Sequence, residues 1–150
     1  MTPLERARKI FSDDLFATQL TGISLDSIDY GSATCSLVLD SSHRNAVGAV
    51  MGGVVFTLAD LSFAAAANSE AIIDTPDGEK VTLPWVSTSS HIVFLAASKG
   101  SRLYATASRI RQGHTQSVFE ISVNDDMGHQ IASVTSIGNR VSPRHTPNDQ

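Results

Sequence analysis

The residues best suited to chemistry lie in one apolar stretch, residues 52–67, which opens with Gly52 and Gly53 and contains a single carboxylate, Asp60. An ionised carboxylate is costly to bury without partners, so a chain that keeps one in an apolar setting often uses it as a base or nucleophile. Because the stretch is rich in alanine and leucine, it predicts a core helix that is apolar on nearly every face. We therefore expect Asp60 to be buried.

The glycine pair at the start of this helix could bind the oxygen of a carbonyl group. A helix amino terminus carries unpaired N–H groups and a favourable dipole, and glycine has no side chain to block a substrate. Asp60 follows Gly52 by eight residues, or about 12 Å along a helix, too far for both to contact one carbonyl carbon. A complete site then requires two subunits with antiparallel helices, which predicts a homodimer with two equivalent composite sites.

The remaining sequence predicts the elements that would hold this helix. An amphipathic helix follows Thr2, because Pro3 and Glu5 complete a helix-start signal with it. Strand patterns occupy six further segments: residues 23–30, 33–39, 83–97, 102–111, 115–124 and 130–140. The short breaks between the last four segments, including Lys99 to Ser101, predict hairpins and an antiparallel meander. We expect one α+β domain over residues 1–141, with a curved antiparallel sheet around the central helix, and a disordered tail over 142–150.

Composition narrows the class of protein. The chain has 150 residues, 41% of them hydrophobic, a net charge of −4 and one cysteine, Cys35, so we expect a cytoplasmic protein without disulfides. The negative charge argues against a nucleic-acid partner, and the apolar run is too short to span a membrane. The five histidines show no metal-ligand spacing, so we expect no metal. The sequence also lacks the motifs of serine hydrolases and of nucleotide-binding phosphate loops.

Several motifs follow one another along the chain: Asn45, Gly52-Gly53, Val54 to Asp60, Asn68-Ser69, residues 86–95 and the turn Arg111-Gln112-Gly113. Together they resemble the hotdog-fold acyl-CoA thioesterases of the phenylacetate-degradation type, over most of the chain. The resemblance implies a hotdog fold and hydrolysis of a small or medium, aryl or fatty, acyl-CoA. It implies no separate cofactor, since coenzyme A enters as part of the substrate. It also implies a homodimer as the catalytic unit, assembled further into a homotetramer.

By position, the resemblance implies four catalytic residues. Asp60 is the nucleophile or general base, the N–H of Gly52 polarises the thioester carbonyl, Asn45 helps to hold the site and Ser87 assists from a strand. Family members typically carry histidine immediately before the glycine pair, where this chain has Met51. We expect the residues that contact substrate, in an acyl pocket or at the phosphates of coenzyme A, to come from this set: Met51, Gly53, Phe56, Leu61, Phe63, Phe94, Lys99, Arg109, Arg111 and Gly113.

Other functions stay open beside hydrolysis. A non-catalytic hotdog module that binds acyl-CoA or an aromatic ligand is favoured by the missing histidine, whereas the retained Asp60 argues against it. A dehydratase or hydratase of the same fold would be expected to carry a catalytic histidine near the helix start, and Met51 argues against this function. Asp60 could also simply cap a second helical segment, residues 60–63.

Overall fold

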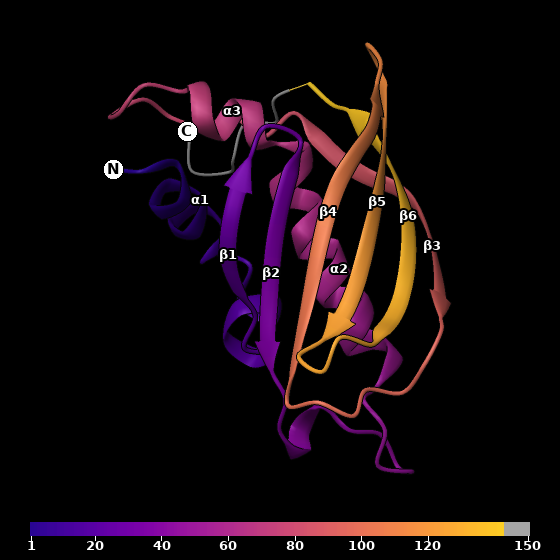
Figure 1. Ribbon diagram of the computed structural model, residues 1–150. Coiled ribbons are helices and arrows are strands. Elements are labelled where there is room, and N and C mark those ends of the chain that lie inside the picture. The colour runs from indigo at the N-terminus through magenta and orange to yellow at the C-terminus, as the bar shows by residue number, and fades with distance from the viewer. Residues whose placement is uncertain (143–150) are drawn as a thin grey trace.

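The computed structural model describes residues 1–142, in which a curved antiparallel sheet wraps around one long helix (Figure 1). The strands are β1 (Ser24–Asp29), β2 (Ser32–Val38), β3 (Trp85–Phe94), β4 (Arg102–Gln112), β5 (Gln116–Asp125) and β6 (Gln130–Arg140). The helices are α1 (Pro3–Phe11), η1 (Phe16–Leu20), η2 (Ser41–His43), α2 (Gly52–Ala67) and α3 (Ser69–Asp74). The predicted α+β class and the predicted central helix are confirmed. The predicted tail, apart from Ser142, lies outside the described residues.

The strand order is β1-β2-β4-β5-β6-β3, which corrects part of the predicted meander. The hairpins from β4 to β5 and from β5 to β6 are present, but β3 pairs with β6 and not with β4. The expected hairpin at Lys99 to Ser101 is therefore wrong. Residues 95–101 form a connection longer than a tight hairpin, and it crosses the end of the sheet from β3 to β4 (Figure 1). As a result, β3 and β1 are the two edge strands.

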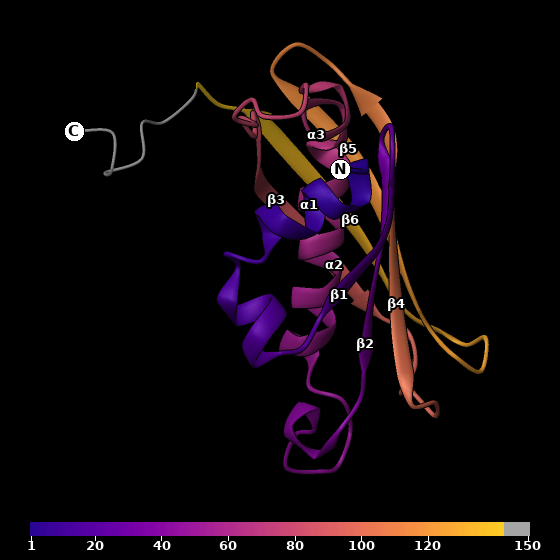
Figure 2. The same cartoon turned by 90° about the vertical axis from the view of Figure 1, so that its left-hand side faces the viewer.

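Helix α2 packs its apolar faces against the concave side of the sheet. Leu58 and Phe63 are buried, and the Phe63 ring meets the Phe119 ring of β5 edge-on, with centroids 5.4 Å apart. The amino-terminal segment lies on the helical side of the sheet (Figure 2). The core thus fills the space between sheet and helix, and the segment after α1 runs past the part of α2 that the sheet leaves open.

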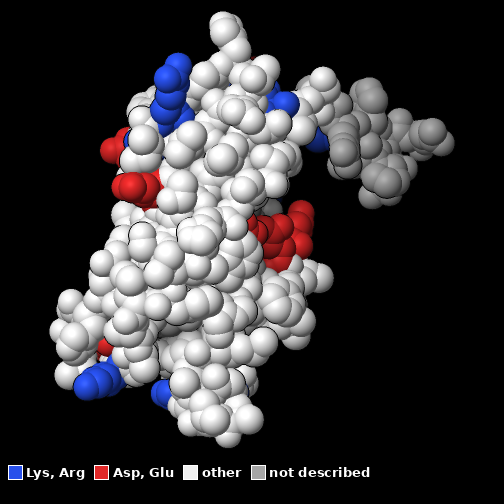
Figure 3. All heavy atoms as spheres, turned by 90° about the vertical axis from the view of Figure 1, so that its right-hand side faces the viewer, with Lys and Arg blue, Asp and Glu red and all other residues white. Residues whose placement is uncertain are grey.

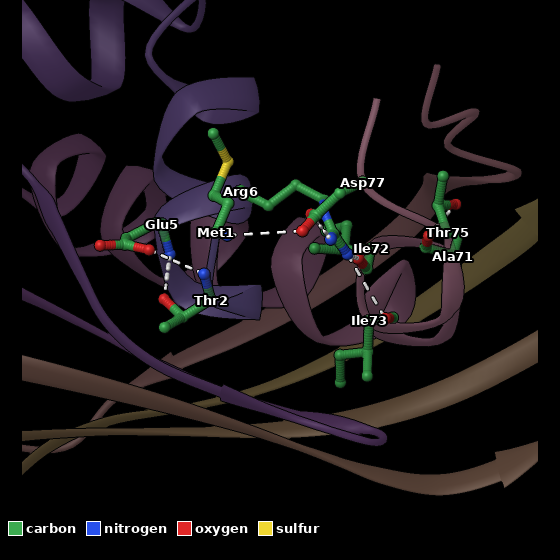
Figure 4. A network of polar contacts seen from close by, with 9 residues as sticks. All are labelled: Met1, Thr2, Glu5, Arg6, Ala71, Ile72, Ile73, Thr75 and Asp77. Atoms are coloured by element: carbon green, nitrogen blue, oxygen red, sulfur yellow. Dashed lines mark hydrogen bonds and ion pairs between the residues drawn. The ribbon is translucent and has the colours of Figure 1, made fainter. Parts of the chain in front are cut away.

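Two sets of polar contacts fix the amino-terminal segment (Figure 4). The predicted helix start is confirmed, because the Thr2 N–H donates to the Glu5 carboxylate at 2.7 Å and the Glu5 N–H donates to the Thr2 hydroxyl at 3.2 Å. Arg6 donates to the carbonyl of Ile72 at 2.5 Å and to the carboxylate of Asp77 at 2.6 Å. Helix α1 is thereby attached to α3 and to the loop after it.

Candidate active site

Asp60 lies on the stripe of α2 that the sheet does not cover, together with Gly53, Thr57 and Ala64. These positions recur every three to four residues, so they share one helix face. The expectation that Asp60 is buried is wrong for the single chain, because its side chain is exposed. The neighbours of Asp60 in sequence are apolar because they meet the sheet, whereas the carboxylate points away from it.

The Asp60 carboxylate borders a hollow of about 360 Å³ between α2 and the segment after α1. The other residues that line this hollow are mostly apolar: Asp14, Leu15, Phe16, Ala17, Phe56, Thr57, Leu61 and Ala64. Partial burial in these walls raises the pKa of Asp60, and the Asp14 carboxylate raises it further. Among residues 1–142, no hydrogen bond or ion pair engages the Asp60 side chain. Asp60 is thus an unpartnered acceptor at an apolar opening.

The other half of the predicted chemistry lies at the amino terminus of α2. Met51 occupies the position before the helix and makes no side-chain cap, and no hydrogen bond within the described chain uses the N–H of Gly52 or Gly53. The Phe94 ring packs over Gly52, where an added Cβ would lie 2.9 Å from the ring. Gly52 and Phe94 line a second hollow of about 460 Å³. The unpaired N–H groups are therefore next to an opening where an oxyanion could bind.

Asn45 organises the loop that leads into α2. Its side-chain oxygen accepts the N–H groups of Val47 and Ala49, each at 3.1 Å, and the Met51 N–H donates to the carbonyl of His43 at 2.9 Å. These bonds fix the direction in which the chain enters the helix. Asn45 therefore supports the Gly52 end through its loop.

Ser87 lies far from the Gly52 end within one chain. It is exposed on the edge strand β3, with its hydroxyl 3.3 Å from that of Ser90. Phe94, which packs on Gly52, is seven residues further along β3, a separation of about 23 Å in an extended strand. A single chain thus brings Asn45 and Gly52 to one end of α2 and leaves Asp60 and Ser87 apart from them.

The aromatic residues expected in an acyl pocket divide into two groups. Phe56 borders the hollow beside Asp60, and Phe94 borders the hollow beside Gly52. The structure contradicts the expectation for Phe63, which is only 1% exposed and packs on Phe119. Phe63 is on the face of α2 that meets the sheet, so it is a core residue.

The basic residues expected to meet phosphates do not form one cluster in space. Lys99 precedes β4 and Arg111 lies near its far end, and the part of the strand between them, from Arg102 to Arg111, is about 30 Å long. Figure 3 shows Lys and Arg side chains gathered toward the two ends of one face. Arg109 forms an ion pair with Glu70 and, with Gly113, lines a separate hollow of about 390 Å³. The predicted cluster rested on proximity in sequence. Because a strand is extended, residues near its two ends lie far apart in space.

Sequence reasoning missed the contribution of Asp14, Leu15 and Phe16. Leu4, Ala7, Phe11 and Leu15 recur at helical spacing, a pattern typical of one apolar helix face. Instead α1 ends at Phe11, and Leu15 and Phe16 are 54% and 64% exposed beside α2. The pair Asp13-Asp14 directly after the helix was the available signal that the chain leaves the core there.

Two features are absent from residues 1–142. None of the helices there has the length and hydropathy needed to cross a membrane. No cluster of histidine, cysteine, aspartate or glutamate in this part of the chain is arranged to hold a metal ion.

The chain is similar to several known sequences and solved structures. It is 28% identical over 138 residues to the acyl-coenzyme A thioesterase PaaI of Escherichia coli, across 91% of this chain and 90% of that protein. The structure of the E. coli PaaI protein from the phenylacetic acid degradation operon matches with a TM-score of 0.79 at 23% identity, over 97% of this chain and 100% of that one. A hypothetical thioesterase from Streptococcus pneumoniae, solved with coenzyme A, matches with a TM-score of 0.74 at 20% identity, over 90% and 99%.

The family model of the thioesterase superfamily matches residues 47–132. This segment contains the Gly52 end of α2, Asp60 and strands β3 to β5, and it is more than half of the 150-residue chain. The match and the fold agree, and the chain belongs to the thioesterase superfamily.

Proposed function

We propose that this protein hydrolyses acyl-CoA thioesters, with Asp60 as base or nucleophile and the Gly52 N–H as oxyanion donor. One observation carries the proposal: within residues 1–142, the Asp60 carboxylate at a largely apolar hollow has no partner, and neither do the N–H groups at the amino terminus of the same helix. Family membership and the name of the E. coli relative support this activity. The neighbour solved with coenzyme A, and one from Streptococcus mutans bound to acetyl CoA, support the class of ligand.

The chemistry requires an attacking oxygen and a donor for the developing oxyanion. An Asp60 oxygen, or a water that Asp60 deprotonates, attacks the thioester carbonyl carbon, and the negative charge on its oxygen is stabilised by the Gly52 N–H. The carbon–sulfur bond then breaks and coenzyme A leaves as the thiolate. Direct attack gives a mixed anhydride that water hydrolyses to the free acid, whereas activated water gives the acid in one step. The raised pKa of Asp60 makes it a better base than an ordinary aspartate.

The proposed site is completed by a second subunit. Gly52 and Asp60 are separated by about 12 Å along α2, so each thioester would contact Gly52 of one chain and Asp60 of another. The open stripe of α2 and the edge strand β3 support this arrangement, since β3 exposes Val86, Val93 and Phe94 next to unpaired backbone groups. We propose a homodimer as the catalytic unit, with a homotetramer as its further assembly.

The hollows favour an apolar acyl group. Phe16, Phe56 and Leu61 surround the opening beside Asp60, and its volume suits a small or medium aryl or fatty group. Lys99 is the cation better placed for a phosphate of coenzyme A, because the preceding residues, Ala97 and Ser98, line the hollow at Gly52. Arg111 and Gly113 lie at the other end of β4 and would have to act at another part of the ligand or in another site.

A panel of aryl and fatty acyl-CoA substrates tests the proposal by measured release of free thiol. We expect turnover by the native protein, and a loss of about 100- to 10,000-fold in Asp60→Asn. Asp13→Asn is the matched control, because it removes a nearby charge that lies outside the hollow. If the native protein binds acyl-CoA but releases no more thiol than Asp60→Asn on any substrate, the protein is instead a non-catalytic binding module.

A further inference from the structure

The hollow beside Asp60 contains a second carboxylate, Asp14, that comes from a different element. The backbone of Asp14 is fixed, since its N–H donates to the carbonyl of Phe11 at 3.0 Å and its carbonyl accepts both the N–H and the hydroxyl of Thr18 at 2.9 Å. Its side chain has no hydrogen bond or ion pair among residues 1–142. Asp14 and Asp60 thus border one opening, and none of its other lining residues within the described chain carries a charge.

Two elements, α2 and the segment after α1, contribute the groups that face Asp60 across the hollow. Helix α2 contributes Asp60 itself, and Thr57, whose hydroxyl already donates to the carbonyl of Gly53 at 2.7 Å. The segment after α1 contributes Asp14 and three apolar residues. Asp13 acts on Asp14 and lies outside the hollow. Within the described chain, Asp14 is therefore the one charged neighbour of Asp60 in this opening.

We propose that Asp14 is a positioning residue that strengthens Asp60 as a base by placing a second negative charge across the hollow. The inference rests on the proposed function, because it concerns the same aspartate. Two close carboxylates in apolar surroundings disfavour each other's ionised form, so each holds a proton more tightly. Burial raises the pKa of Asp60 and Asp14 raises it further, which is the direction this cause requires. The pKa of Asp14 is itself raised by burial and then by Asp13.

The pH dependence of kcat/KM separates this electrostatic role from a structural one. Because Asp60 must be ionised to act, activity falls as the pH falls through its pKa. Asp14→Asn should move this acid limb to lower pH. At a pH on the limb, the variant should therefore keep a fraction of its plateau kcat/KM that is roughly two- to fivefold larger than the fraction kept by the native protein. Asp14→Glu, which keeps the charge, should restore the native limb, and Asp13→Asn should move it less. A structural role would lower kcat/KM at every pH without moving the limb.

A second measurement is independent of catalysis. Titration of the ¹³C-labelled Asp60 carboxyl by NMR should give a lower midpoint in Asp14→Asn than in the native protein. Equal midpoints, or a limb unchanged by Asp14→Asn, overturn the inference even if the enzyme is active. Undiminished turnover in Asp60→Asn would overturn the proposed function instead, and the NMR titration would still decide whether Asp14 acts on Asp60. If Asp14→Asn does not fold, Asp14→Ser serves in both measurements.

Discussion

The hairpin between β5 and β6 and the helix α2 each hold a carboxylate, but the surroundings of the two negative charges are opposite: one is hydrogen-bonded by several donors and the other by none within the described chain. In the hairpin, Asp125 accepts the N–H groups of Lys99 at 3.2 Å, Met127 at 3.0 Å and His129 at 2.9 Å. Burial alone would raise the pKa of Asp125, but these bonds and the His129 side chain lower it to about 2. These N–H donors and the Asp125 carboxylate are hydrogen-bonded to each other, so this carboxylate stabilises the fold.

On α2, the same kinds of group are kept apart. The N–H donors of Gly52 and Gly53 lie at the helix start, about 12 Å from Asp60, and neither side of this potential pair is satisfied within the described chain. Burial and Asp14 raise the pKa of Asp60, the reverse of the direction at Asp125. A carboxylate surrounded by donors is therefore structural, whereas donors and an acceptor that are kept apart remain available to a ligand.

Beside the loss expected for Asp60→Asn in thiol release, the largest expected effect comes from blocking the donor half on α2. In Gly52→Val, a branched side chain would occupy the approach to the unpaired N–H, where even a Cβ comes within 2.9 Å of Phe94. We expect thiol release to fall by about 100- to 1,000-fold, the cost of losing one oxyanion donor. Phe94 is exposed and can move, so the melting temperature should change little. Full activity in a folded Gly52→Val protein would show that the N–H at the start of α2 is not used by the substrate.

The next effect is the loss of stability in Asp125→Asn. The substitution removes the charge and turns an amide nitrogen toward backbone donors, so we expect the melting temperature at pH 7 to fall by several degrees. Because the pKa of Asp125 is lowered in the folded state, its stabilisation is present above the unfolded pKa of about 3.9 and is lost as the pH falls toward 2. Thermal unfolding from pH 7 to pH 2.5 should therefore show the two proteins converging, whereas the exposed Asp13→Asn should resemble the native protein throughout.

Asp60→Asn should change stability in the opposite sense and by less. A raised pKa means that the folded state resists ionisation of Asp60, so the stability associated with protonated Asp60 is present at low pH and is lost as the pH rises through the folded pKa. Removing the charge should therefore raise the melting temperature at pH 7 by about one or two degrees. The gain should vanish below about pH 4, near the unfolded pKa of an aspartate. A lower melting temperature at pH 7 would show that Asp60 has partners after all.

The smallest effect is expected from Met51→His. Met51 is 53% exposed and makes no side-chain cap, so the exchange should leave the fold intact. Turnover should stay equal or rise by up to about threefold, because histidine adds a polar group beside the Gly52 N–H without removing a donor. Met127→His, at an exposed methionine of the hairpin, is the matched control in the same assay. A large loss with Met51→His alone would mean that the site has been rebuilt around methionine.

The sequence predicted the local elements better than their arrangement. Alanine-rich composition and the glycine pair define α2 from Gly52 to Ala67, and Thr2 with Glu5 defines the start of α1, because these signals act over a few residues. The position of β3 could not be predicted in this way. Pairing of β3 with β6 instead of β4 depends on how a connection of seven residues crosses the sheet, and no local pattern records that path.

The sequence offered candidate site residues but did not predict their environment. The spacing of Gly52 and Asp60 already implied that one chain cannot complete the site. The exposure of Asp60 was not predictable from its apolar neighbours, since it depends on which stripe of α2 the sheet leaves open. Asp14 lines the same hollow from a segment 46 residues earlier in the chain, an arrangement that sequence spacing does not reveal.

Subunit mixing tests most directly whether two chains share each site. Asp60→Asn and Gly52→Val, each inactive alone, are coexpressed with different tags, and mixed dimers carrying both tags are purified and assayed for thiol release. Each mixed dimer has one site with both substitutions and one with neither, so we predict about half of the native activity per dimer. Mixed dimers that form but stay as inactive as their parents would contradict the shared site, as would an active monomer.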